Sequence, residues 1–189
     1  MFDCGFGFLS STRAPGGLPV NAGLFSQTAN SATITNTTTE STLIDGGVGV
    51  LTVPANGFAL GDSFMAHMNG HLSSVNNTNI TFRVKSGSVI LATSGLVQLP
   101  QTTNQAFSLN LIFTIRSLGT TGVAAIQTNG LFTYTKDASN AFEGKDLSDL
   151  NNTTFSTLIS NTLDITAQWA TANPLNVIYS ETFVLNKIY

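Results

Sequence analysis

The chain contains two histidines, His67 and His71, which are four residues apart. On a helix this spacing would let both imidazoles bind one metal ion. On a strand each residue advances the chain by about 3.3 Å, so the two side chains would stand about 13 Å apart and could not share an ion. The flanking residues alternate between apolar and polar, which is typical of a strand. We therefore interpret both as surface or interface histidines.

Charged residues concentrate in one segment, which carries six of them within 14 positions: Lys136, Asp137, Glu143, Lys145, Asp146 and Asp149. Paired carboxylates could cleave a glycosidic bond or bind Ca²⁺. The segment lacks the alternating aspartates of a calcium loop, and Gly144 is out of register with one. We predict a solvent-exposed loop between two strands, at the tip of the domain.

Other catalytic motifs are missing from the sequence. It has no G-x-S-x-G nucleophile motif and no phosphate-binding glycine loop that opens a helix. Cys4 is the single cysteine, which excludes an internal disulfide. We interpret it as a small buried apolar residue, with a reactive thiol or an intermolecular bridge as the alternative. We predict no catalytic, cofactor-binding or metal-binding residue, and therefore no enzyme.

Exposed aromatic rings could stack on sugars, and the candidates are Trp169, Tyr134, Tyr179 and Tyr189. Trp169 has the same strand parity as Leu163 and Ile165, so we assign it to the core. The sequence does not place Tyr189.

Composition describes an apolar chain with a neutral polar surface. Of the 189 residues, 42% are hydrophobic and only 9% are charged, and Thr, Ser and Asn together supply 63. Soluble domains usually have about 25% charged residues. Seven Lys and Arg are too few for a nucleic-acid binder, and no apolar run approaches the roughly 20 residues of a membrane helix. The start of the chain shows no signal-peptide pattern, and the length favours one domain.

Period-two alternation of apolar and polar residues predicts strands over 64–72, 80–85, 107–116 and 163–169. Less regular apolar runs predict further strands over 41–44, 48–53, 88–93, 122–128, 131–135 and 177–188. Asn129-Gly130 between two of these runs predicts a type I′ hairpin turn. Residues 141–150 could form one or two helical turns. The total is nine or ten strands and no long helix.

This pattern predicts an all-β fold, an antiparallel two-sheet β-sandwich, with a closed barrel as the alternative. Long strands and uneven connections favour a single jelly roll over an immunoglobulin-type sandwich, whose Cys–Trp–Cys signature is missing. Residues 1–38 contain phenylalanines separated by Gly and Pro, and we expect them to form an extended N-terminal arm. Residues 39–189 would form the jelly roll.

Part of the chain resembles structural proteins of viruses and phages. The resemblance covers residues 39–128 and is carried by strand and turn motifs: Thr39-Glu40-Ser41-Thr42-Leu43-Ile44, Leu51-Thr52-Val53-Pro54-Ala55-Asn56, Leu60-Gly61-Asp62-Ser63-Phe64, Thr81-Phe82-Arg83-Val84-Lys85-Ser86-Gly87 and the later segment 113–122. It implies a single jelly-roll virion protein.

The low charge also predicts a building block, because charged residues resist burial at subunit interfaces. We expect a non-enzymatic penton or minor capsid protein of an icosahedral virus, located in the virion. Its partners would be copies of itself, with a pentamer favoured and a trimer as the alternative, and neighbouring capsid proteins. The other hypotheses are a trimeric fibre or tail receptor-binding head, and a carbohydrate-binding or hydrolytic β-sandwich.

Overall fold

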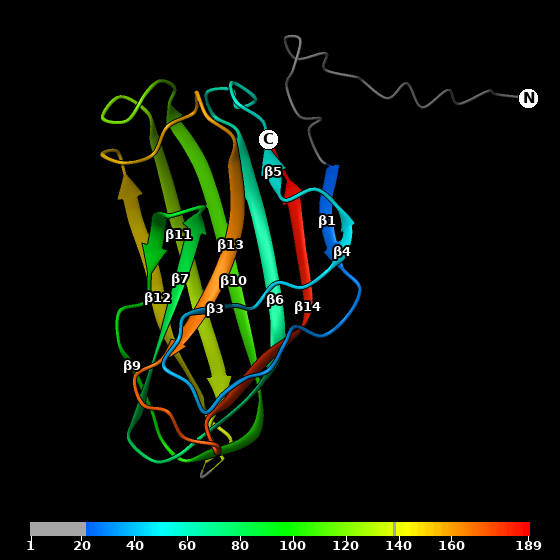
Figure 1. The fold of residues 1–189 in the computed structure, drawn as a ribbon, viewed down its shortest axis with the longest axis vertical. Helices are drawn as coiled ribbons and strands as arrows, with labels where there is room; N and C mark the ends of the chain where they lie inside the picture. Colours follow the sequence, from blue (N-terminus) through cyan, green and yellow to red (C-terminus); the bar gives the residue numbers. More distant parts are fainter. Residues whose placement is uncertain (1–21, 138) are drawn as a thin grey trace, which may run out of the picture.

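The computed structural model describes residues 22–137 and 139–189 (Figure 1). These residues form fourteen strands and no helix. The strands pair in the antiparallel direction and make two sheets. The predicted all-β architecture with two antiparallel sheets in a sandwich is confirmed. Within the described residues, nine strands are five residues or longer.

The larger sheet, sheet A, has eight strands. In spatial order they are β12 (Phe142–Asn151), β11 (Ala125–Thr135), β10 (Thr102–Ser117), β6 (Ser63–Ser74), β14 (Val177–Lys187), β1 (Ala22–Gln27) and β4 (Gly47–Gly49), with the short β2 (Ile34–Thr35) also beside β14. The long strands β6, β10 and β11 lie next to one another in this sheet. The alternation of apolar and polar residues in the sequence is clearest in β6 and β10.

The smaller sheet, sheet B, has six strands. Four follow one another in the order β3 (Ser41–Thr42), β13 (Asn161–Trp169), β7 (Thr78–Ser86) and β8 (Val89–Thr93). The two others are short: β5 (Thr52–Val53) pairs with β13, and β9 (Val97–Leu99) pairs with β7.

Strands from opposite ends of the described chain pair in a nested series. β1 pairs with β14, β3 with β13, β6 with β10, and β7 with β8. The first and third of these pairs lie in sheet A, and the second and fourth lie in sheet B. These four pairs are nested in the sequence and alternate between the two sheets. β11 and β12 form an additional hairpin that extends sheet A beyond β10.

The core lies between the sheets and is built from the predicted apolar positions. β6 buries Phe64, Ala66, Met68 and Leu72, and every second residue of β10 from Phe107 to Ile115 is buried in the same way. The rings of Phe82 in sheet B and Phe132 in sheet A meet with centroids 4.3 Å apart.

One ion pair is completely buried near the end of β14. The ammonium group of Lys187 lies 3.0 Å from Oδ1 of Asp62, and both side chains have zero exposure. Oδ2 of Asp62 accepts a hydrogen bond from the backbone N–H of Ala59 at 2.9 Å. This pair connects the last strand to the turn that precedes β6.

The prediction of a hairpin turn at Asn129-Gly130 is wrong. Both residues lie inside β11, which runs without interruption from Ala125 to Thr135, and neither has the positive φ that a type I′ turn requires. A Cβ at position 130 would lie 2.3 Å from Cδ2 of Leu111 and 3.0 Å from the carbonyl oxygen of Asn110. Glycine is therefore needed here for the close approach of β10, not for a turn.

The predicted loop over 136–149 and the suggested helical turns over 141–150 are also wrong, although most described residues of the segment are solvent-exposed, as predicted. Most of this segment is β12, the edge strand of sheet A, which pairs with β11 from Phe142 to Asn151. Its charged side chains fit a known property of edge strands, in which charges oppose pairing with other chains.

The expected N-terminal arm falls partly outside the described residues. Residues 1–21, including Cys4, lie outside them. Residues 22–38 contain β1 and β2, which both pair with β14 in sheet A (Figure 1).

Candidate functional site

The two histidines lie on the outer face of sheet A, on the same side of β6. Nδ1 of His71 is 3.2 Å from Oε1 of Glu181, without the alignment of a hydrogen bond, and its ring stacks on Tyr179 with centroids 6.1 Å apart. Among the described residues, no three His, Cys, Asp or Glu side chains gather into a group that could hold a metal ion.

The acidic residues of 136–149 do not converge on one point. The carboxylate of Glu143 accepts a hydrogen bond from the hydroxyl of Tyr134 and lies 2.8 Å from Nζ of Lys136. Asp137 instead accepts the backbone N–H of Thr103 at 2.7 Å. Glu143 and Asp149 share one face of β12, but six residues of strand separate them by about 20 Å. This spacing is too large for a pair of glycosidase carboxylates.

The Tyr134–Glu143 contact has an electrostatic consequence. The hydrogen bonds from Lys136 and Tyr134 lower the pKa of Glu143 below its usual value. Burial, together with the carboxylate of Glu143, raises the pKa of Tyr134. Both groups are therefore held in their ordinary states at neutral pH, the carboxylate charged and the phenol neutral.

Two of the four candidate aromatic residues are unavailable to a sugar. Trp169 is buried, as predicted, and its indole N–H donates to the carbonyl oxygen of Ile34 at 3.2 Å. Tyr134 is buried as well. Tyr179 packs on His71, and Tyr189 is exposed near the other end of the same strand. The exposed rings therefore do not form a platform.

The outer face of sheet A is a broad surface built from cross-strand rows. Each row takes one residue from β14, β6, β10 and β11 in turn, as set by the registers of these strands. The three central rows are Thr182–Asn69–Ser108–Thr133, Val184–His67–Asn110–Leu131 and Asn186–Met65–Ile112–Asn129. We call these twelve residues the central face.

The central face contains no Asp, Glu, Lys or Arg. Its apolar members are partly exposed: Ile112 by 47% and Leu131 by 48%. Charged side chains on this side of the sheet stand at the margins, with Glu181 beside His71, Arg116 near the end of β10, and Asp146 on edge strand β12, opposite Leu131. Neutral cross-strand hydrogen bonds also occur, such as Asn69 Nδ2 to Thr182 Oγ1 at 3.3 Å.

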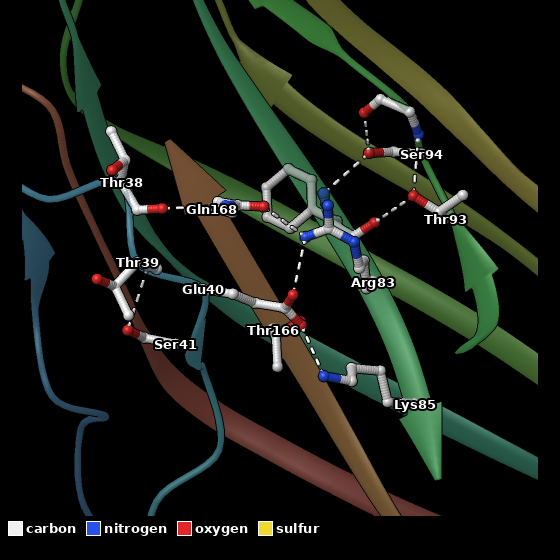
Figure 2. Close-up of polar contacts among 12 residues, drawn as sticks. Thr38, Thr39, Glu40, Ser41, Arg83, Lys85, Thr93, Ser94, Thr166 and Gln168 are labelled. Carbon is white, nitrogen blue, oxygen red and sulfur yellow. Dashed lines mark hydrogen bonds and ion pairs between the residues drawn. The ribbon is translucent and has the colours of Figure 1, made fainter. Parts of the chain in front are cut away.

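The outer face of sheet B has the opposite character (Figure 2). Glu40 reaches across it and accepts hydrogen bonds from Arg83 at 3.1 Å, Lys85 at 2.9 Å and Thr166 at 2.7 Å. Gln168 accepts a hydrogen bond from Arg83 at 2.8 Å and donates one to the carbonyl oxygen of Thr38 at 3.0 Å. Both cations are paired with the same carboxylate within the chain, and these contacts fasten the segment before β3 onto the sheet.

The environment of Glu40 favours its charged form. Burial works against the carboxylate, but the hydrogen bonds from Thr166 and Lys85 and the positive charge of Arg83 outweigh it, so the pKa of Glu40 is lowered. Sequence reasoning missed this cluster. Arg83 and Lys85 share one face of β7, which is a readable signal, but nothing in the sequence pairs them with a residue more than 40 positions away.

Comparison with protein-family models found no match, and comparison with curated proteins found no significant similarity. No helix in the described part of the chain is long and apolar enough to cross a membrane. The candidate functional surface is the central face of sheet A, and this assignment rests on the structure alone.

Proposed function

We propose that the protein is a non-enzymatic structural subunit that assembles with copies of itself through the central face of sheet A. The observation that carries this proposal is the absence of charged residues from the twelve positions of that face, across four strands. Removing a charge from water at an interface costs free energy, and the cores of interfaces are depleted of charged residues for this reason. The central face has no Asp, Glu, Lys or Arg to remove from water, so its burial does not carry this free-energy cost.

The apolar side chains of the central face supply a driving force. Met65, Ile112, Leu131 and Val184 are spread over four different strands, so a partner that covers them covers the whole face. Burial contributes about 25 cal/mol for each Å² of apolar surface removed from water. The Asn, Ser and Thr side chains between them can donate and accept hydrogen bonds to polar groups on a second copy. In a ring of five or three copies, the central face of one copy meets a different surface of its neighbour, because every contact in such a ring joins two unlike surfaces.

We further propose that the fold is a single jelly roll and that the subunit is a capsid protein. The nested pairing of β1 with β14, β3 with β13, β6 with β10 and β7 with β8 supports the jelly roll, since that fold is an antiparallel ribbon wound through two sheets. The resemblance of residues 39–128 to virion proteins supports a penton or minor capsid role. On this proposal the protein acts in the virion, as a pentamer in contact with neighbouring capsid proteins.

The test is the molar mass in solution, measured by light scattering behind a sizing column over a concentration series. We expect wild-type protein to form an oligomer, with five copies for the penton role. Ile112→Lys should shift the mass to the monomer, because it places a charge within the face, on one of its two inner strands. The control is Val123→Lys, an exposed position (61%) in the loop between β10 and β11; it should leave the mass unchanged.

The outcomes separate the hypotheses. A trimer that Ile112→Lys dissociates would support the same face but favour the fibre or tail head. A monomer at all concentrations, or an oligomer that Ile112→Lys does not affect, would refute assembly through this face.

A further inference from the structure

An apolar pocket lies between the two sheets, beside β5, and encloses about 60 Å³. Twelve of its lining residues are apolar and three are neutral polar; none is charged. Leu24, Phe64 and Leu185 line it from sheet A, and Val53, Leu91 and Leu163 line it from sheet B. The pocket is therefore an extension of the core that the side chains of residues 22–137 and 139–189 do not fill.

The residues between β4 and β5 form a lip over this pocket. The backbone N–H of Val50 donates to the carbonyl oxygen of Leu24 at 2.7 Å, and Leu51 accepts a hydrogen bond from the N–H of Leu163 at 3.0 Å. The lip thus bridges β1 of sheet A and β13 of sheet B. Val50 is itself 55% exposed, so the pocket reaches the surface at this point.

Gly49 permits the close approach of the lip to β1. Its φ is +104°, and a Cβ at this position would lie only 2.0 Å from the carbonyl oxygen of Leu24. The lip itself makes two backbone hydrogen bonds, and the short pairings of β4 with β1 and of β5 with β13 hold it on either side. Leu51 packs against the core, whereas Val50 stands at the surface.

The polar groups of the lining are already engaged inside the protein. Ser86 donates to Oδ1 of Asn161 at 2.8 Å, and the Asn161 amide donates to the carbonyl oxygens of Ser156 and Ile159. Thr52 is hydrogen-bonded to Thr162 at 2.7 Å. The lining therefore offers a ligand neither a charged group nor a hydrogen-bonding group that is not already used within the protein. A charged ligand is excluded for this reason, and affinity would come from the hydrophobic effect.

We propose that this pocket binds an uncharged apolar group, the size of one or two methylene groups, which enters under Val50 and Leu51. Dry apolar cavities in proteins bind small apolar species such as xenon. The proposal is independent of self-assembly, because the pocket lies between the sheets and the central face lies on the outside of sheet A.

The test is a xenon titration of protein carrying ¹³C-labelled Leu and Val methyl groups, followed by NMR. We expect saturable shifts of the Leu24, Leu51 and Leu163 methyls, and none for Leu131 and Val184 on the central face. Leu163→Phe should fill the pocket and weaken binding at least tenfold. The matched control, Leu96→Phe, makes the same change at an exposed position outside both the pocket and the central face and should bind like wild type.

A second variant keeps the test decisive if Leu163→Phe does not fold. Val50→Phe changes an exposed lip residue, and it should block the mouth and weaken binding by a similar factor. Shifts that rise linearly over surface methyls, or undiminished binding by a folded pocket variant, would overturn the proposal. Neither result would bear on the mass measurement that tests self-assembly.

Discussion

At the scale of single residues, Lys187 and Asp62 give the sharpest prediction about stability. Both are completely buried, and their charged groups are 3.0 Å apart. Removing one partner of a buried ion pair leaves the other charge uncompensated and typically costs 3–5 kcal/mol. We expect Lys187→Met to lower the free energy of unfolding by about 3–5 kcal/mol, measured by urea denaturation. Lys145→Met, in the exposed pair with Asp146, should change it by less than about 1 kcal/mol.

The environment of Glu40 predicts how the stability of the protein depends on pH. Its pKa in the folded protein is lowered from the ordinary value of 4.5, so the folded state binds fewer protons than the unfolded state at acid pH. The stability that Glu40 contributes is then present above pH 4.5 and is lost as the pH falls through the folded-state pKa. We expect Glu40→Gln to destabilise the protein more at about pH 7 than at about pH 3. A difference that is equal at both pH values, measured by urea denaturation, would contradict this account.

At the scale of strands, Gly130 distinguishes a continuous β11 from a hairpin. A Cβ there would collide with Leu111 of β10, and overpacking of this kind costs about 1–3 kcal/mol. We expect Gly130→Ala to destabilise the protein by that amount in urea denaturation. Leu111→Ala should cost less in the Gly130→Ala background than in wild type, because it removes the collision. Additive effects of the two substitutions would mean that the close approach is absent.

Strands β6, β10 and β11 together show what local sequence can and cannot predict. The alternation in 64–72 and 107–116 predicted both the strands and their buried faces, because one buried face imposes a period of two. Asn129-Gly130 matched a turn motif, yet the glycine is required by a neighbouring strand, and local patterns do not report such contacts. The charges of 136–149 predict solvent exposure, and solvent exposure alone does not distinguish a loop from an edge strand.

The candidate surface was predicted only in part. Low charge predicted a building block, and strand parity put His67 on a polar face. The central face itself depends on the order β14, β6, β10, β11, which brings together residues more than 100 positions apart. The Glu40 cluster depends on long-range pairing in the same way.

At the scale of the whole molecule, the two sheets divide the charges unequally, and this predicts how assembly responds to salt. On sheet B the charges of Glu40, Arg83 and Lys85 are paired within the chain, whereas the central face of sheet A has none. Salt screens interactions between exposed charges, with a Debye length that falls from about 14 Å to about 4 Å between 0.05 and 0.5 M. Association through an uncharged face should not weaken over this range. We expect the oligomer mass, at fixed protein concentration, to be the same at both ends of it. A mass that falls toward the monomer at high salt would mean that the marginal charges, Arg116, Asp146 and Glu181, hold the copies together instead of the central face.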